Sequence, residues 1–200
     1  MQALAAIGLH QGFVYARELI ERSTKFTAAD TLCRSSHKPF LVVGGPYGSS
    51  GIRLRFNIKA HGCGDLCTDV NPLACAGCPY QAGDICSLPF SANQFGAVFC
   101  SHVLEHMANV QDAAAAWSEL NRVADSVFVC VPGKDSIGGW LAPGHHIWVH
   151  QMSNNIIRVE ERSNSNIYLV NSNGVIESQN NSRRGSMRRH GIYQAAHLGE

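Results

Sequence analysis

The sequence lacks several features that would place a protein in a class at once. It has no apolar run of about 18 residues, so no segment reads as a membrane-spanning helix. Its net charge is only +1, so charge alone indicates no partner. No basic region precedes the short apolar stretch at the N-terminus, and we expect no signal peptide. The 200 residues, 45% of them hydrophobic, suit one globular domain.

Cysteine, by contrast, is plentiful, with eight in the chain. Without a secretory signal, we expect reduced thiols and a cytoplasmic protein. Cys75 and Cys78 have the C-x-x-C spacing of a zinc knuckle or a redox pair. A zinc site needs a second pair, and Cys63 and Cys67 are spaced more loosely. We therefore predict small buried thiols and no metal site, with a structural zinc ion as the alternative.

Short apolar runs alternate with helix signals, which predicts an α/β fold. The expected strands are Pro39–Val43, Asp65–Val70, Phe95–Cys100 and Ser126–Val131. The expected helices are Ala3–Arg22, Thr27–Ser36, Ser50–Lys59, Val103–Met107, one capped by Asn109, and one from Ser153 to about Glu161. A closing hairpin should pair Asn166–Asn171 with Val175–Ser178 around Asn173 and Gly174.

Glycines and acids follow the first two strands. Gly44, Gly45 and Gly48 come directly after the first strand, where a glycine turn lets the backbone approach a ligand. Asp69 ends the second strand, and Asn71 follows it. The spacing from Gly44 to Asp69 favours an acid that accepts hydrogen bonds from ribose hydroxyls. A turn or helix-cap role for Asp69 is the alternative.

The stretch from Gly83 to Val123 carries the most specific pattern, with GDICSLPF, then SHVLEH, then ELNRV. It resembles the middle of a class I S-adenosylmethionine (SAM)-dependent methyltransferase, and the resemblance extends over about Pro39 to Gln151. It implies a Rossmann-like sandwich with a mostly parallel seven-stranded sheet and an antiparallel last strand. Residues 1–178 would form one domain, with 1–36 as a helical cap. The cofactor would be SAM, bound by Gly44, Gly45, Gly48, Asp69, Asn71, Asp84, Ile85, Ser101 and His102.

The candidate catalytic residues are histidines. The segment from Trp140 to His150 leaves the carboxyl end of the last predicted parallel strand, beside the expected methyl group. His145, His146 or His102 could remove a proton from an acceptor, because histidine titrates near neutrality. The acceptor itself is not indicated. A packed aromatic cover without a catalytic role is the alternative for this segment.

Two other functions compete with methyl transfer. Val42 and Pro46 stand where the family has an acid and a glycine, and Gly96 stands where it often has an acid, which favours a non-catalytic SAM-fold binding protein. His102 to His106 also reads H-x-x-E-H, the pattern of a zinc metalloprotease. Residues 179–200 form a polar, basic tail that we expect to be solvated, with nucleic-acid binding as its alternative.

Overall fold

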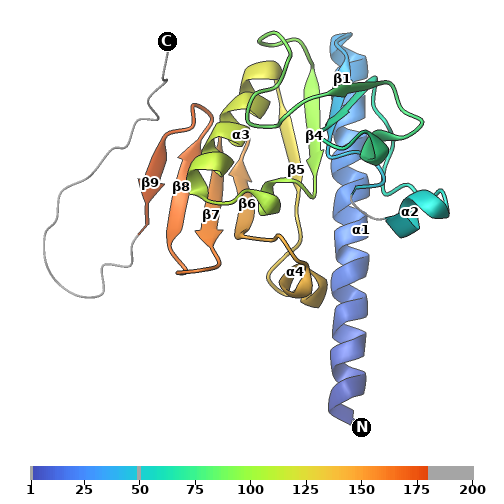
Figure 1. Ribbon diagram of the computed structural model, residues 1–200, viewed down its shortest axis with the longest axis vertical. Coiled ribbons are helices and arrows are strands. Elements are labelled where there is room, and N and C mark those ends of the chain that lie inside the picture. The colour runs from blue at the N-terminus through green and yellow to red at the C-terminus, as the bar shows by residue number, and fades with distance from the viewer. Residues whose placement is uncertain (1, 49–50, 180–200) are drawn as a thin grey trace, which may run out of the picture.

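A five-stranded parallel sheet with strand order β3-β2-β1-β4-β5 organises the fold (Figure 1). The computed structural model describes residues 2–48 and 51–179. The strands are β1 (Phe40–Val43), β2 (Leu66–Asp69), β3 (Tyr80–Ala82), β4 (Ala97–Ser101) and β5 (Val127–Cys130). The order reverses between β1 and β4, the place where open α/β sheets bind their ligands. Four of the five strands match the sequence prediction, and β3 was missed.

Helices cover both faces of this sheet. They are α1 (Gln2–Ser36), α2 (Gly51–Arg55), α3 (Val110–Val123) and α4 (Ile137–Leu141), with short 3₁₀ turns η1 (Pro72–Cys75) and η2 (Leu104–His106). The side chain of Asn109 caps α3 by accepting from the backbone N–H of Asp112, as predicted. The predicted helix Val103–Met107 is only the 3₁₀ turn η2, and Ser50–Lys59 shortens to α2, with residue 50 outside the described part.

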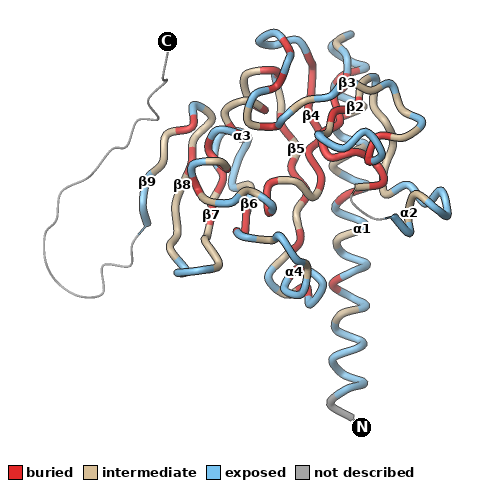
Figure 2. The backbone as a smooth tube through the Cα atoms, in the orientation of Figure 1, coloured by how far each residue is buried: buried red, intermediate tan, exposed pale blue. Residues whose placement is uncertain are grey.

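The N-terminal region forms one helix instead of the two that were predicted. No proline or glycine lies between Gly12 and Ser36, so nothing in residues 23–26 breaks α1. Its C-terminal half packs on the sheet through Ala29 and Cys33, which are buried with Phe40, Val42 and Phe99. Its N-terminal half extends beyond the body of the molecule (Figure 1) and is largely exposed (Figure 2).

The opposite face of the parallel sheet packs against α3. Leu41 and Val43 point to this face because side chains alternate along a strand. They join a core that contains Trp117 and Leu120 of α3, both fully buried. The buried segments of this core lie at the centre of the molecule in Figure 2.

A second sheet replaces the C-terminal part of the predicted single sheet. It is antiparallel with order β6-β7-β8-β9, formed by β6 (Ile147–Ser153), β7 (Ile156–Glu161), β8 (Ile167–Asn171) and β9 (Ile176–Ser178). The α/β class is confirmed, but the described residues form five parallel and four antiparallel strands in two sheets instead of seven in one. The predicted closing hairpin is confirmed as β8 and β9, with Gly174 at positive φ.

The predicted helix from Ser153 to Glu161 is wrong, because this segment forms the turn and the second strand of a β-hairpin. β6 and β7 pair antiparallel across a tight turn at residues 154–155. Ile157 and Val159 are both buried, with their neighbours more exposed, which is the two-residue period of a strand. The β-branched residues favour this choice over a helix.

The expectation that all eight cysteines are free is corrected at one pair. Cys63 and Cys78 form a disulfide, with their Cα atoms 5.4 Å apart. Cys63 precedes β2 and Cys78 precedes β3, and these two strands are parallel neighbours. The same end of both strands therefore carries the two cysteines within disulfide range. Cys67 and Cys75 are buried free thiols, as expected.

Two sequence predictions remain, one on the basic tail and one on membrane-spanning segments. The basic tail lies outside the described residues apart from Gln179. Of the helices in residues 2–48 and 51–179, none combines the length and apolar character needed to cross a bilayer.

Candidate functional site

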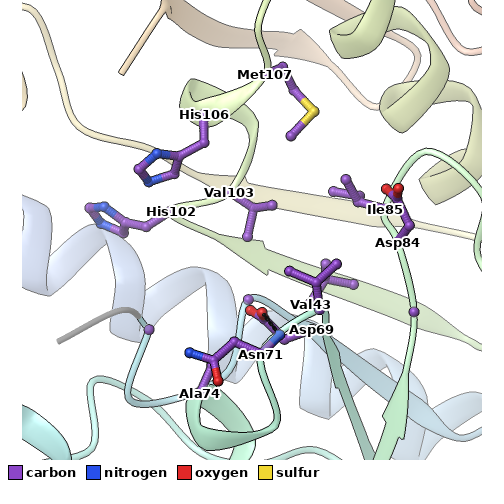
Figure 3. Close-up of a pocket in the computed structure, with 14 residues that line it drawn as sticks. Val43, Asp69, Asn71, Ala74, Asp84, Ile85, His102, Val103, His106 and Met107 are labelled. Atoms are coloured by element: carbon purple, nitrogen blue, oxygen red, sulfur yellow. Dashed lines mark hydrogen bonds between the residues drawn. The ribbon is translucent and has the colours of Figure 1, made fainter. Parts of the chain in front are cut away.

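A cavity of about 330 Å³ opens at the carboxyl edge of the parallel sheet, where the strand order reverses. Figure 3 shows its lining: Asp69, Asn71 and Val43 on one side, Asp84 and Ile85 on another, and His102, Val103 and His106 opposite. Seven residues predicted to bind cofactor line it, namely Gly44, Gly48, Asp69, Asn71, Asp84, Ile85 and His102. The remaining two, Gly45 and Ser101, line an adjoining cavity of about 190 Å³.

The glycine turn after β1 is fixed by close backbone contacts. Gly44 has φ +99°, and a Cβ there would lie 2.6 Å from the carbonyl oxygen of Ser101. Gly45 has φ +55°, and its Cβ would lie 2.3 Å from the carbonyl oxygen of Ala74. Only glycine fits both the backbone conformation and the space. The turn thus holds β1, β4 and η1 together directly beneath the cavity.

The two acids line the cavity from different strands. The carboxylate of Asp69, at the end of β2, accepts a hydrogen bond from the backbone N–H of Asn71 at 2.8 Å. Burial raises the pKa of Asp69, while backbone hydrogen bonds from Asn71 and Val70 act in the opposite direction. Asp84 accepts from the backbone N–H of Cys86 at 2.9 Å. Each acid therefore stabilises a turn, as the alternative for Asp69 foresaw, and also lines the cavity.

His102 sits at the end of β4 between an acid and an arginine. Its Nδ1 lies 3.2 Å from the buried carboxylate of Glu105, and its Nε2 contacts the guanidinium of Arg22. A guanidinium only donates, so in the neutral form of the ring Nε2 accepts and the proton stays on Nδ1. Burial alone would lower the pKa of His102, but contacts with the side chains of Cys130 and Glu105 outweigh it and raise the pKa to about 9.

The other two candidate bases lie farther along the chain, in the segment before β6. His145 is largely buried, its Nδ1 lies 3.0 Å from the carbonyl oxygen of Gly139, and its Nε2 lies 3.9 Å from Glu105. Burial is the main cause that lowers the pKa of His145. His146 has an exposed side chain, and its backbone N–H donates to the carbonyl of Glu105. The described lining of the main cavity contains neither histidine.

Sequence reasoning missed Arg22, which reaches the second cavity from α1. Arg22 is 5% exposed, and its Nε and Nη1 make no hydrogen bond with any described residue. A signal did exist: Arg22 lies on the same helix face as Val14, Ala29 and Cys33, all buried. An arginine on the apolar face of a helix is a costly placement that calls for an anionic partner. Arg17, on the same helix, differs from Arg22 because it already has an anionic partner, the carboxylate of Asp135.

The structure does not support a zinc metalloprotease site at the H-x-x-E-H pattern of His102 to His106. An H-x-x-E-H zinc site needs both histidines on one face of a helix. His102 instead has φ +55° at the end of a strand, and η2 is only three residues long. The two histidines are therefore not presented as a helical pair.

Comparison with known proteins gives one family match. Residues 62–127 match a family described as a methyltransferase domain, which confirms the predicted resemblance over that third of the chain. This stretch runs from β2 to the first residue of β5 and carries Asp69, Asp84 and His102. No match was found among curated proteins.

Several solved structures align with the chain at low similarity. They include the SAM-bound amino pentose methyltransferase CalS10 from Micromonospora echinaspora (16% identity, 73% of this chain and 66% of that one, TM-score 0.37). Another is the sugar N-methyltransferase KedS8 from Streptoalloteichus sp ATCC 53650 (16%, 79% and 71%, TM-score 0.36). A third is the trans-methyltransferase CalH with SAH (18%, 54% and 37%, TM-score 0.36). In this and two further matches the chain spans only 34% to 39% of the other protein.

Proposed function

We propose that this chain is a SAM-dependent methyltransferase. The observation that carries the proposal is the cavity at the reversal of strand order, lined by a glycine turn and by acids from two strands. Such a cavity suits a ligand with a ribose diol and an adenine amine, both of which donate hydrogen bonds. The match of residues 62–127 to a methyltransferase domain supports the same function.

The residues present fit the parts of SAM. The free oxygen of Asp69 would accept from the ribose hydroxyls, and Asp84 with Ile85 would hold the adenine. Arg22 would face the carboxylate of the amino-acid end from the second cavity, because its buried Nε and Nη1 need an acceptor. Gly44 and Gly45 let the backbone approach between these two ends. Bound SAM would supply an electrophilic methyl group on a sulfonium.

Among the three candidate bases, His102 is the one that lines both cavities. With Arg22 turned from Nε2 to the SAM carboxylate, the neutral form of His102 would accept a proton at Nε2 from an oxygen or nitrogen acceptor, and Glu105 would stabilise the resulting imidazolium. His145 would not act as the base itself, because its ring faces Glu105 and not the cavity. We keep His146 as a base only for an acceptor that reaches the exposed rim.

Calorimetric titration with SAM tests the cofactor site. We expect Asp69→Ala to weaken binding by roughly 1–3 kcal/mol, about 5- to 150-fold, because the ribose loses a charged acceptor. Asp84→Ala should act in the same direction but less strongly. Asp125→Ala is the matched control, because Asp125 lies before β5 at the opposite edge and pairs with Lys38. If Asp69→Ala binds SAM like the wild type, the ribose assignment is wrong.

A second candidate function is SAM binding without methyl transfer. Pro46 supports it, because proline has no N–H to offer a ligand from the glycine turn. Measurement of SAH release over a panel of hydroxyl and amine acceptors separates the two functions. For a methyltransferase we expect turnover to rise with pH through about 9, as His102 loses its proton. His102→Ala should lower turnover roughly 10²-fold and abolish that rise. SAM binding with no product from any acceptor would favour the second function.

A further inference from the structure

Glu105 is a buried carboxylate that the proposed methyl transfer leaves largely unexplained. Its side chain is 1% exposed, and neither oxygen accepts a well-aligned hydrogen bond from any described residue. A carboxylate in this state is costly unless a cation or donors compensate it. His102 approaches only one of the two oxygens, at 3.2 Å. The charge of Glu105 is therefore only partly compensated by the described residues.

Two imidazoles converge on this carboxylate from different segments. His106 follows Glu105 in η2, and His145 comes from the segment before β6. One oxygen of Glu105 and one ring nitrogen of each histidine all lie within 4.8 Å of one another. The two rings stand edge to face with centroids 4.7 Å apart.

Both rings are held in the tautomer that a metal ligand needs. Nδ1 of His106 lies 3.0 Å from the carbonyl oxygen of Gly144, and Nδ1 of His145 lies 3.0 Å from that of Gly139. A carbonyl only accepts, so both Nδ1 atoms carry the proton and both Nε2 atoms keep a free lone pair. Histidines that bind metals are usually oriented by such a bond from the other nitrogen. The approach of His102 to Glu105 places a donor behind the carboxylate in the same way.

We propose that Glu105, His106 and His145 form a binding site for a divalent transition metal of the Zn²⁺ class. Two imidazoles and one carboxylate are a ligand set that zinc uses with its remaining position open. Bonds of about 2.0–2.2 Å require the three side chains to close by roughly 1 Å, and His145 must move as well as His106, because its Nε2 lies 3.9 Å from Glu105. This proposal departs from the sequence-based expectation of no metal.

The location gives the site a use that rests on the proposed methyl transfer. His106 lines the cofactor cavity together with His102, so the open position of the metal would face the same space. An acceptor with a hydroxyl or phenolate oxygen could bind there and lose its proton more easily. The metal site would thus favour oxygen acceptors and place them at the histidine side of the cavity, opposite Asp84 (Figure 3).

Titration of chelator-treated, full-length protein with Co²⁺ tests the site without any turnover. We expect about one Co²⁺ per chain, with visible d–d absorption, displaced by Zn²⁺ but not by Mg²⁺. His106→Ala, His145→Ala and Glu105→Gln should each weaken binding by tenfold or more. His106→Ala is the decisive variant, because this side chain is exposed and its loss should leave the fold intact. His150→Ala, exposed on β6, is the matched control and should bind like the wild type.

Three results would overturn the metal site. One is the absence of Co²⁺ binding by the wild-type protein. Another is unchanged binding in His106→Ala and His145→Ala. The last is binding that Cys75→Ser abolishes, with thiolate charge-transfer bands, which would assign the ion to the cysteines. SAM titration of the same samples keeps the two proposals separate, because SAM binding that persists without Co²⁺ binding removes the metal site alone.

Discussion

The two sheets of this molecule bury their strands in different ways. In the parallel sheet, every residue of β1 and of β4 is buried, because α1 covers one face and α3 the other. In the antiparallel sheet, buried and more exposed residues alternate along β7, because only one face packs against α3. The doubly covered sheet holds the main cavity at its edge. The singly covered sheet positions His145, which precedes β6, beside Glu105.

This contrast separates two ways of building a site. The cavity residues Asp69, Asp84 and His102 lie at or just after the carboxyl ends of three strands of the parallel sheet, so local sequence places them. The cluster of Glu105, His106 and His145 depends on docking of the second sheet against η2, across about 40 residues of chain. Changes within the parallel sheet should therefore affect the cavity. Changes at the contact between the two sheets should affect both the cavity and the cluster.

The largest effect should come from Trp117 of α3, because its core joins residues of both sheets. Its side chain is fully buried together with Leu41 of the parallel sheet and Ile157 of the antiparallel one. Trp117→Ala should cost about 3–5 kcal/mol of unfolding free energy in denaturant titrations. Trp117→Phe should cost far less, since it keeps an aromatic ring and removes a buried N–H without a described partner. Two separate unfolding transitions in the wild type would show that the sheets are independent units.

An intermediate effect is expected in the glycine turn, which belongs to the parallel sheet alone. Gly45→Ala must place a Cβ 2.3 Å from the carbonyl oxygen of Ala74 at a positive φ. We expect a loss of about 1–3 kcal/mol in stability, together with weaker SAM binding. Gly48→Ala is the control, because Gly48 also has positive φ but no atom within 4 Å of its Cβ. Equal losses in both variants would mean that backbone strain, and not the contact with Ala74, decides the effect.

The smallest effect at neutral pH concerns the α1 face of the parallel sheet, and it becomes visible only as the pH falls. His61 packs with Phe26 of α1 and Phe99 of β4, and burial is the main cause that lowers its pKa to about 4. As the pH falls, His61 of the unfolded chain takes up a proton near pH 6.5, whereas His61 of the folded chain takes it up only near pH 4. Stability should therefore be complete above about pH 6.5 and fall toward pH 4, by at most about 1.4 kcal/mol per pH unit.

The variant His61→Phe isolates this contribution. Phenylalanine can fill the same aromatic cluster and has no proton to gain, so the fall in stability between pH 6.5 and 4 should become shallower. Urea titrations at several pH values measure it. An unchanged slope in the variant would mean that other groups cause the acid sensitivity.

The sequence by itself determined the parallel half of the fold. Four apolar runs of strand length, the glycines after β1 and the cap of α3 were all readable, because they depend on local patterns of residue type. The cavity residues followed from these, since the carboxyl ends of parallel strands meet at one edge. Their roles with SAM remain proposals.

Tertiary structure decided what depends on contacts between distant segments. The strand β7 was mistaken for a helix, because a short apolar segment suits either element until its pairing partner is known. The disulfide of Cys63 and Cys78 required knowledge that β2 and β3 lie side by side. Arg22 reached the second cavity, and His145 reached Glu105, only through the packing of α1 on one face and of the second sheet near η2. Such contacts are set by the burial of apolar surface over the whole chain, and local sequence does not specify which segments meet.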